Sequence, residues 1–174
     1  MKRILSTVLS AILLALMIPG LTGCKAKPKD WYKETLDYYT EGVKTNWANE
    51  DKSLRLNISQ DLKDYSKNRG YLLTDLDGDG IDELLIGFTD NSTSTKFTDV
   101  IVWHSDLGAS KLLGGAEGYY IGLCANNVLS VDSEYGSQRE RTFMKWNSKK
   151  NAFDVISDGE GKYLPMKWEL TPFK

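Results

Sequence analysis

Apolar residues between positions 30 and 47 recur every three or four residues, which predicts an amphipathic helix. This stripe is formed by Tyr32, Leu36, Tyr39, Val43 and Trp47. Asp30 precedes the stripe and is suited to cap the helix. A weaker stripe with the same spacing is formed by Leu54, Ile58, Leu62 and Tyr65. Gly70 is suited to end it, so the pattern predicts two helices.

Beyond residue 70 the apolar positions gather into short runs separated by turn residues, which predicts β-strands. The first two runs, at residues 71–74 and 84–88, flank a loop rich in aspartate. Further strands are expected at residues 97–103, 111–113, 119–124, 128–131, 141–146, 152–156 and 163–170. Pro165 restricts the last of these to an edge of the sheet. The regular spacing of the turns favours an antiparallel meander.

The first 23 residues have the pattern of a bacterial export signal. A positive start, Met1-Lys2-Arg3, precedes an apolar run over residues 4–18, which is shorter than the roughly 20 residues that a membrane-spanning helix needs. The run leads to Leu21-Thr22-Gly23-Cys24, which resembles a bacterial lipobox. That resemblance implies that Cys24 is lipidated and becomes the new N-terminus. An ordinary secretory signal with an unrelated cysteine is the alternative.

The expected organisation is therefore a lipoprotein signal peptide over residues 1–23, a lipidated Cys24 with a basic tether over residues 24–29, and a single domain over residues 30–174. Two acyl chains give stable membrane anchoring where one is marginal. The tether, Lys25-Ala26-Lys27-Pro28-Lys29, is suited to anionic lipid headgroups. We expect the protein on the extracellular face of the cell membrane.

Composition narrows the classes of function. The 174 residues carry a formal net charge of −2, and no basic stretch exists beyond the tether, so nucleic acid is not expected as a partner. One histidine and two cysteines leave little for a zinc site and nothing for a disulfide framework.

The loop between the first two strands carries the sharpest chemistry. It reads Asp75-Leu76-Asp77-Gly78-Asp79-Gly80-Ile81-Asp82-Glu83. Carboxylates at alternate positions allow a curled chain to direct oxygen ligands at one ion, and Gly80 permits the tight turn. Oxygen ligands in this number and order suit Ca²⁺ better than Mg²⁺, which demands a stricter octahedron. The alternative is an acidic hairpin turn without a metal, since Asp-Gly pairs favour turns.

The loop is not an EF-hand, because its twelfth position is Ile86 and its flanks are predicted strands. It resembles the strand–loop–strand calcium turns of FG-GAP and related surface-protein repeats. This resemblance implies side-chain ligands from Asp75, Asp77, Asp79 and Glu83 and a carbonyl ligand from Ile81. Asp82 receives no role. A single copy of the turn is present, whereas those repeats come in series and close into a propeller.

The mature chain as a whole resembles a group of uncharacterised lipoproteins from Gram-positive gut bacteria. The resemblance is carried by the aromatic first helix, the loop with its flanking strands, and the ending Trp168-Glu169-Leu170-Thr171-Pro172-Phe173. It implies location and architecture and brings no enzymatic activity.

Two residues suggest catalysis on their own chemistry. His104 ends a predicted strand and has the chemistry of a general base, although a lone histidine near a turn is more often a surface residue. Cys124 is expected to be a buried, inert thiol. Neither forms part of a recognisable catalytic motif, and no catalytic residue or organic cofactor is predicted. Aromatic residues such as Tyr119, Tyr120, Trp146 and Trp168 suit either a binding face or the core.

These patterns predict an α+β domain with N-terminal helices packed on a curved antiparallel β-meander that contains a calcium-binding turn. The expected function is that of a membrane-anchored surface lipoprotein with a structural Ca²⁺ site, which binds an extracellular protein or carbohydrate and is not an enzyme. A small extracellular hydrolase of cell-wall or polysaccharide substrates is the alternative.

Overall fold

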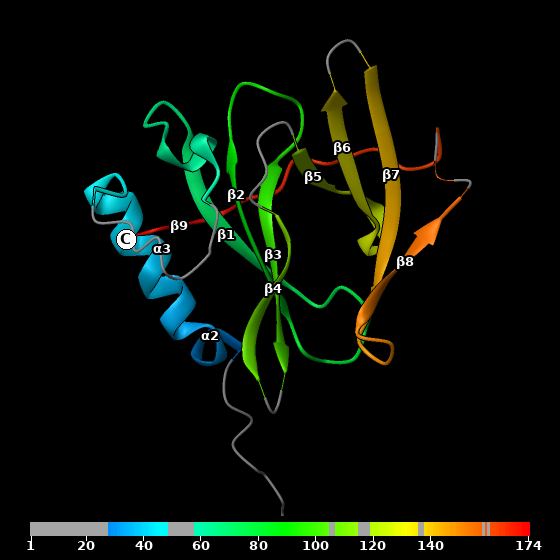
Figure 1. Ribbon diagram of the computed structural model, residues 1–174, viewed down its shortest axis with the longest axis horizontal. Helices are drawn as coiled ribbons and strands as arrows, with labels where there is room; N and C mark the ends of the chain where they lie inside the picture. The colour runs from blue at the N-terminus through cyan, green and yellow to red at the C-terminus, as the bar shows by residue number, and fades with distance from the viewer. Residues whose placement is uncertain are drawn as a thin grey trace, which may run out of the picture.

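The computed structural model describes residues 28–48, 58–104, 107–114, 119–135, 138–157, 159 and 161–174 (Figure 1). The export signal, Cys24 and most of the basic tether lie outside these residues. The described part is mostly antiparallel sheet with one long helix, which agrees with the predicted α+β class and the meander.

The long helix carries the predicted apolar stripe. A four-residue helix, α2 (Pro28–Trp31), leads into α3 (Lys33–Thr45), and Asp30 lies inside α2 instead of capping α3. Chain direction changes after Thr45, where Asn46 and Trp47 take φ angles of 50° and 60°. The Trp47 N–H closes the helix end on the carbonyl of Gly42 at 2.7 Å. Four stripe residues are buried, namely Tyr32, Leu36, Tyr39 and Trp47.

The second predicted helix is wrong over the residues that the structure describes. Residues 60–63 form a short 3-10 helix, η2 (Gln60–Lys63), with the Ser59 side chain accepting from the Asp61 N–H. The Asp64 carboxylate then accepts from both the N–H and the hydroxyl of Ser66. This local turn competes with helix formation. Tyr65 is 64% exposed, so the weaker stripe does not continue into the core.

Nine strands form one antiparallel sheet among the described residues. They are β1 (Asn68–Thr74), β2 (Glu83–Thr89), β3 (Lys96–His104), β4 (Gly108–Gly114), β5 (Tyr119–Leu123), β6 (Leu129–Tyr135), β7 (Gln138–Asn147), β8 (Ala152–Ile156) and β9 (Thr171–Pro172). A short 3-10 turn, η3 (Ala125–Asn127), joins β5 to β6. The order is β8-β7-β6-β5-β3-β2-β1-β9, and β4 pairs with β3 beside this path. Thus β3 is shared between β4 and β5.

The chain after β8 does not form the predicted strand over residues 163–170. It crosses behind the sheet in Figure 1 and reaches β1, where β9 pairs with Gly70 and Tyr71. Along the way, the Met166 N–H bonds to the Leu123 carbonyl, and the Thr95 N–H bonds to the Met166 carbonyl. Pro165 has no N–H to donate and forms only an isolated bridge with Cys124, so no continuous ladder forms.

Apolar side chains pack on both faces of the sheet. Alternate residues of β2 point to opposite faces, with Leu84, Ile86 and Phe88 in the cluster under α3 and Leu85 in the cluster on the other side. Trp168 and Leu170 of the crossing segment pack against the second cluster. Phe173 packs on the first, with its ring 6.0 Å from that of Tyr39 and 5.8 Å from that of Tyr71. The end of the described chain therefore completes the core under the first helix.

Candidate metal centre

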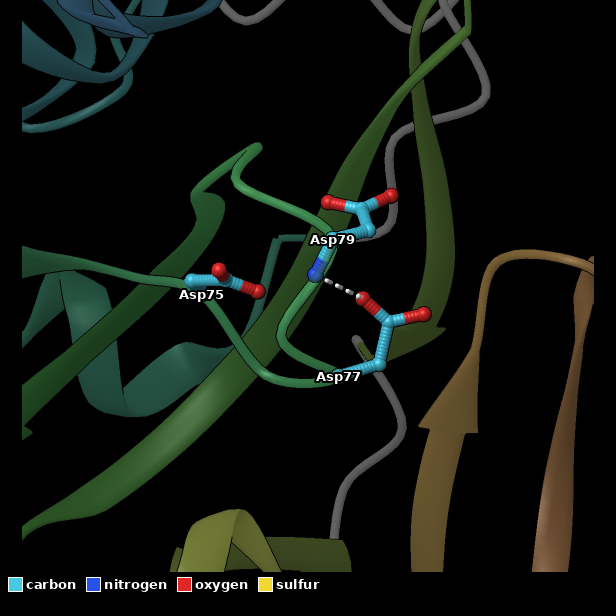
Figure 2. Close-up of side chains that lie close together, drawn as sticks. All are labelled: Asp75, Asp77 and Asp79. Atoms are coloured by element: carbon cyan, nitrogen blue, oxygen red, sulfur yellow. Dashed lines mark hydrogen bonds between the residues drawn. The ribbon is translucent and has the colours of Figure 1, made fainter.

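The aspartate loop joins the paired ends of β1 and β2. Thr74 and Glu83 are the last residues in register, and the loop runs between them. Figure 2 shows Asp75, Asp77 and Asp79 along this one curled segment. A carboxylate oxygen of each lies within 4.8 Å of those of the other two. The folding of the loop thus brings together three of the four predicted side-chain ligands.

Backbone N–H groups of the loop hold the carboxylates in place. Asp75 accepts from the Gly78 N–H at 2.7 Å and from the Gly80 N–H at 2.9 Å. Asp79 accepts from the Ile81 N–H at 2.8 Å. Gly80 takes a φ of 87°, a left-handed value that favours glycine, so its predicted role in the tight turn is confirmed. These bonds hold both carboxylates along one tightly wound loop.

Glu83 lies behind the loop and is only 2% exposed. Its carboxylate accepts from the Leu76 N–H at 2.7 Å and does not belong to the close group of three. Burial raises the pKa of Glu83 to about 8; the Leu76 N–H opposes this shift, and the charges of the three aspartates add to it. A buried carboxylate among other carboxylates is a position that a cation would stabilise. The carbonyl ligand from Ile81 stays a prediction.

Three contacts tie the loop to segments that are distant in the sequence. The Ser148 N–H, between β7 and β8, donates to the Asp77 carboxylate at 2.7 Å. The Asn127 side-chain amide donates to the Asp75 carbonyl at 2.7 Å, and the Tyr32 hydroxyl donates to the Asp82 carbonyl at 2.9 Å. No local sequence signal marks these partners. The loop is therefore a junction between the helix, η3 and the β7–β8 turn.

The same contacts act on the charges of the loop. Burial alone would raise the pKa of Asp77, but hydrogen bonds from Ser148 and the Asp79 N–H outweigh it and leave the pKa below its ordinary value. Burial, together with the nearby charge of Glu83, raises the pKa of Tyr32. Tyr32 therefore stays protonated and keeps its bond to the loop.

The residues present fit a calcium ion. All the donors are carboxylate or backbone oxygens, which are the ligands of hard cations, and the loop offers no nitrogen or sulfur that would favour a transition metal. Asp75, Asp77 and Asp79 would hold the ion, which would neutralise their mutual repulsion and fix the β1–β2 connection. The predicted Glu83 ligand lies outside this group, bonded to the Leu76 N–H, and stays a prediction.

The two residues that suggested catalysis do not belong to the close group of aspartates. His104 is half-buried at the end of β3, in register with Gly108. Cys124 is fully buried, as predicted, and burial raises the pKa of its thiol. Trp146 belongs to the core, and the Trp168 ring N–H donates to the Leu123 carbonyl at 2.9 Å. The predicted burial of the thiol is confirmed, and these two tryptophans serve packing.

A polar pocket of about 330 Å³ lies beside the single register pair of β3 and β5, Phe97 with Ile121. Tyr120, Asp132 and Arg141 lie directly opposite one another on β5, β6 and β7 and line its wall. Two nitrogens of the Arg141 guanidinium donate to the Asp132 carboxylate, with the Nη2 to Oδ2 distance at 2.8 Å. The pocket thus combines an aromatic ring with paired charges. Tyr120 is one of the aromatic residues predicted to suit either a binding face or the core, whereas the approach of Asp132 and Arg141 depends on strand register.

Comparison with protein-family models, with curated proteins and with solved structures finds no match to this chain. Among the helices in the described ranges, none is both long and apolar enough to cross a membrane.

Proposed function

We propose that this protein is a lipid-anchored module on the extracellular face of the cell membrane, that one Ca²⁺ stabilises its fold, and that it binds an extracellular partner. The observation that carries the calcium part is the meeting of three aspartate carboxylates within 4.8 Å, with buried Glu83 behind them. The lipobox-like sequence that ends at Cys24 supports the anchor.

Calcium binding is tested by thermal unfolding of the chain that begins at Lys25. Extracellular modules bind Ca²⁺ with Kd of about 10⁻⁴–10⁻³ M. Ion at ten times its Kd adds about 1.4 kcal/mol to the free energy of unfolding, which raises Tm by several degrees. Asp77→Asn should remove this gain, because it deletes a charged ligand while an amide oxygen can still accept from Ser148.

The matched control is Asp82→Asn in the same loop. Its backbone carbonyl keeps the bond from Tyr32, and its side chain has no assigned part in the site. This variant should keep the full response to calcium. Identical melting of the unsubstituted chain with calcium and with chelator would reject a stabilising ion.

The anchor is tested by cell fractionation. The unsubstituted protein should sediment with membranes, whereas Cys24→Ala should appear in the soluble fraction. Mass spectrometry of the membrane form should find a diacylated N-terminal cysteine. Membrane association that persists in Cys24→Ala would point to another mode of attachment.

We place the binding role in the pocket lined by Tyr120, Asp132 and Arg141. Both cationic groups of the pocket have carboxylate partners: Arg141 pairs with Asp132, and Lys96 pairs with Asp90 at 3.1 Å. Balanced charges beside an aromatic ring suit an uncharged polyhydroxylated ligand, because hydroxyl groups can use both donors and acceptors while the ring covers a sugar face. Carbohydrate is therefore the favoured partner.

A glycan array with the fluorescently labelled chain tests this role. Glycans that bind the unsubstituted chain should lose binding to Tyr120→Ala and keep binding to Tyr65→Ala, an exposed tyrosine outside the pocket. Binding that survives Tyr120→Ala would move the site elsewhere, and an array without a single binder would remove carbohydrate from the proposal.

A further inference from the structure

Two tryptophans stack at the end of the molecule where the described chain begins. Trp31 closes α2, and its ring lies 6.0 Å from that of Trp103 with 19° between their planes. The Tyr32 ring meets Trp103 edge-on at 6.5 Å. Both tryptophans are only partly buried. Figure 1 shows α2 beside the turn end of the β3–β4 hairpin.

A strongly exposed leucine lies next to this pair. Leu107 is 76% exposed and precedes Gly108, the first residue of β4. The Trp103 ring is 3.8 Å from the position that a Cβ on Gly108 would occupy, so the ring lies against the residue that follows the leucine. We call Trp31, Trp103 and Leu107 the aromatic end. Tryptophan is common at membrane interfaces, because its side chain combines a large apolar ring with a polar indole N–H. Leucine adds a purely apolar side chain to this surface.

The length of the tether places this surface close to the lipid. Pro28 is four residue steps from Cys24, and a chain spans at most about 3.6 Å per residue, so α2 begins within about 14 Å of the acylated cysteine. The bilayer is therefore the nearest large apolar phase for exposed side chains at this end. This step rests on the proposed lipid anchor.

We propose that the aromatic end docks on the phospholipid bilayer, with Leu107 entering the boundary between headgroups and acyl chains and the two tryptophans at headgroup level. Charge is not the driving force, because the three tether lysines are opposed by Asp30 and Glu34 and also by the aspartate loop. The loop lies at the same end of the sheet, since Leu84 after the loop pairs with Ile101 near the end of β3. The docking is driven by apolar contact between the aromatic end and the bilayer, which the lipid anchor holds close together. It orients the domain, so that the opposite end of the sheet points away from the membrane.

The experiment uses the full-length lipoprotein in vesicles of phosphatidylcholine and phosphatidylglycerol with calcium present. Leu107→Cys is labelled with an environment-sensitive fluorophore; Cys24 is acylated and Cys124 is buried, so the label is specific. The emission should shift to shorter wavelength on reconstitution and should be quenched by lipids that carry a nitroxide near the headgroup. Unfolding temperatures confirm that the labelled chain is folded.

Tyr65→Cys is the matched control. Tyr65 is 64% exposed and lies three residues before β1, which runs in the same direction as β3 because both are antiparallel to β2. Its end of the sheet is therefore the one that lies away from the β3–β4 turn, about 25 Å along β3. The label at Tyr65 should show neither the shift nor the quenching.

The outcomes separate docking from anchoring. Protein that floats with the vesicles while the label at residue 107 remains unquenched overturns the docking and leaves the anchor intact. Equal quenching at residues 107 and 65 overturns the defined orientation. Protein that does not float overturns both proposals, since the docking depends on the anchor.

Discussion

The hydroxyl of Tyr39 donates a 3.0 Å hydrogen bond to the carboxylate of Asp99, which joins α3 to the middle of the sheet. Asp99 is fully buried, and its same oxygen also accepts from the Thr98 hydroxyl at 3.0 Å. Its other oxygen pairs with the Lys111 ammonium of β4 at 2.5 Å. A buried carboxylate with partners from three elements fixes the position of the helix, because any displacement would leave charge unpaired in the core.

Tyr39→Phe should lower the free energy of unfolding by about 1.5–3 kcal/mol, since the bond that is lost goes to a charged, buried acceptor. Urea denaturation measures the change. The same substitution at exposed Tyr65 should alter stability by no more than about 0.5 kcal/mol. Equal effects at the two positions would mean that the hydroxyl of Tyr39 contributes nothing specific.

Glu83→Gln should make the chain less dependent on calcium. The amide oxygen can still accept from the Leu76 N–H, while the buried negative charge is removed. Because burial disfavours that charge, the variant should be at least as stable as the unsubstituted chain in chelator and should gain less Tm on addition of calcium. Differential scanning calorimetry with both solutions gives the two differences. A full calcium gain in the variant would exclude Glu83 from the site.

Asn127→Gly should lower the free energy of unfolding by about 1 kcal/mol, because it removes the side-chain bond to the Asp75 carbonyl. Asn126 offers a close control, since it is exposed and has a φ of 58° where Asn127 has 56°. Glycine tolerates both values, so Asn126→Gly should be neutral or slightly stabilising. The difference in urea midpoint between the two variants isolates the hydrogen bond, and no difference would contradict its contribution.

Asp90→Asn should weaken the dependence of stability on acid. Hydrogen bonds from Ser92, followed by contact with Lys96, hold the pKa of Asp90 below its ordinary value. The unfolded chain takes up this proton near pH 4, before the folded chain does, so the contribution is present above that pH and is lost as pH falls toward the folded pKa. The loss of Tm between pH 7 and pH 3 should therefore be smaller in the variant. Equal losses of Tm in the variant and the unsubstituted chain over this pH range would show that the Asp90 contacts are not linked to folding.

The elements with strong repeating patterns were predictable from the sequence. The first apolar stripe is in the core, and the turn residues separate the strands of the meander. The convergence of Asp75, Asp77 and Asp79 also followed from their alternation, because it depends on local chain geometry. Local periodicity and local turns carry this information without knowledge of tertiary packing.

The errors and omissions have long-range or competing causes. The second predicted helix does not form over the described residues, because the Asp64 carboxylate accepts from the Ser66 N–H in a local turn. The last predicted strand does not form, because Met166 bonds to Leu123 of β5 and to Thr95 before β3 and no ladder follows. Ser148 and Asn127 could not be found as partners of the loop, since their approach depends on strand register far along the chain.

The contact of Phe173 with Tyr39 has a consequence for biogenesis. Rings from nearly opposite ends of the chain must meet before the cluster under α3 is closed, so a nascent polypeptide cannot finish this core while its C-terminal part is still being synthesised. The cluster under α3 therefore stays open until late in translation, and its surface is exposed for most of the time that the chain takes to be made.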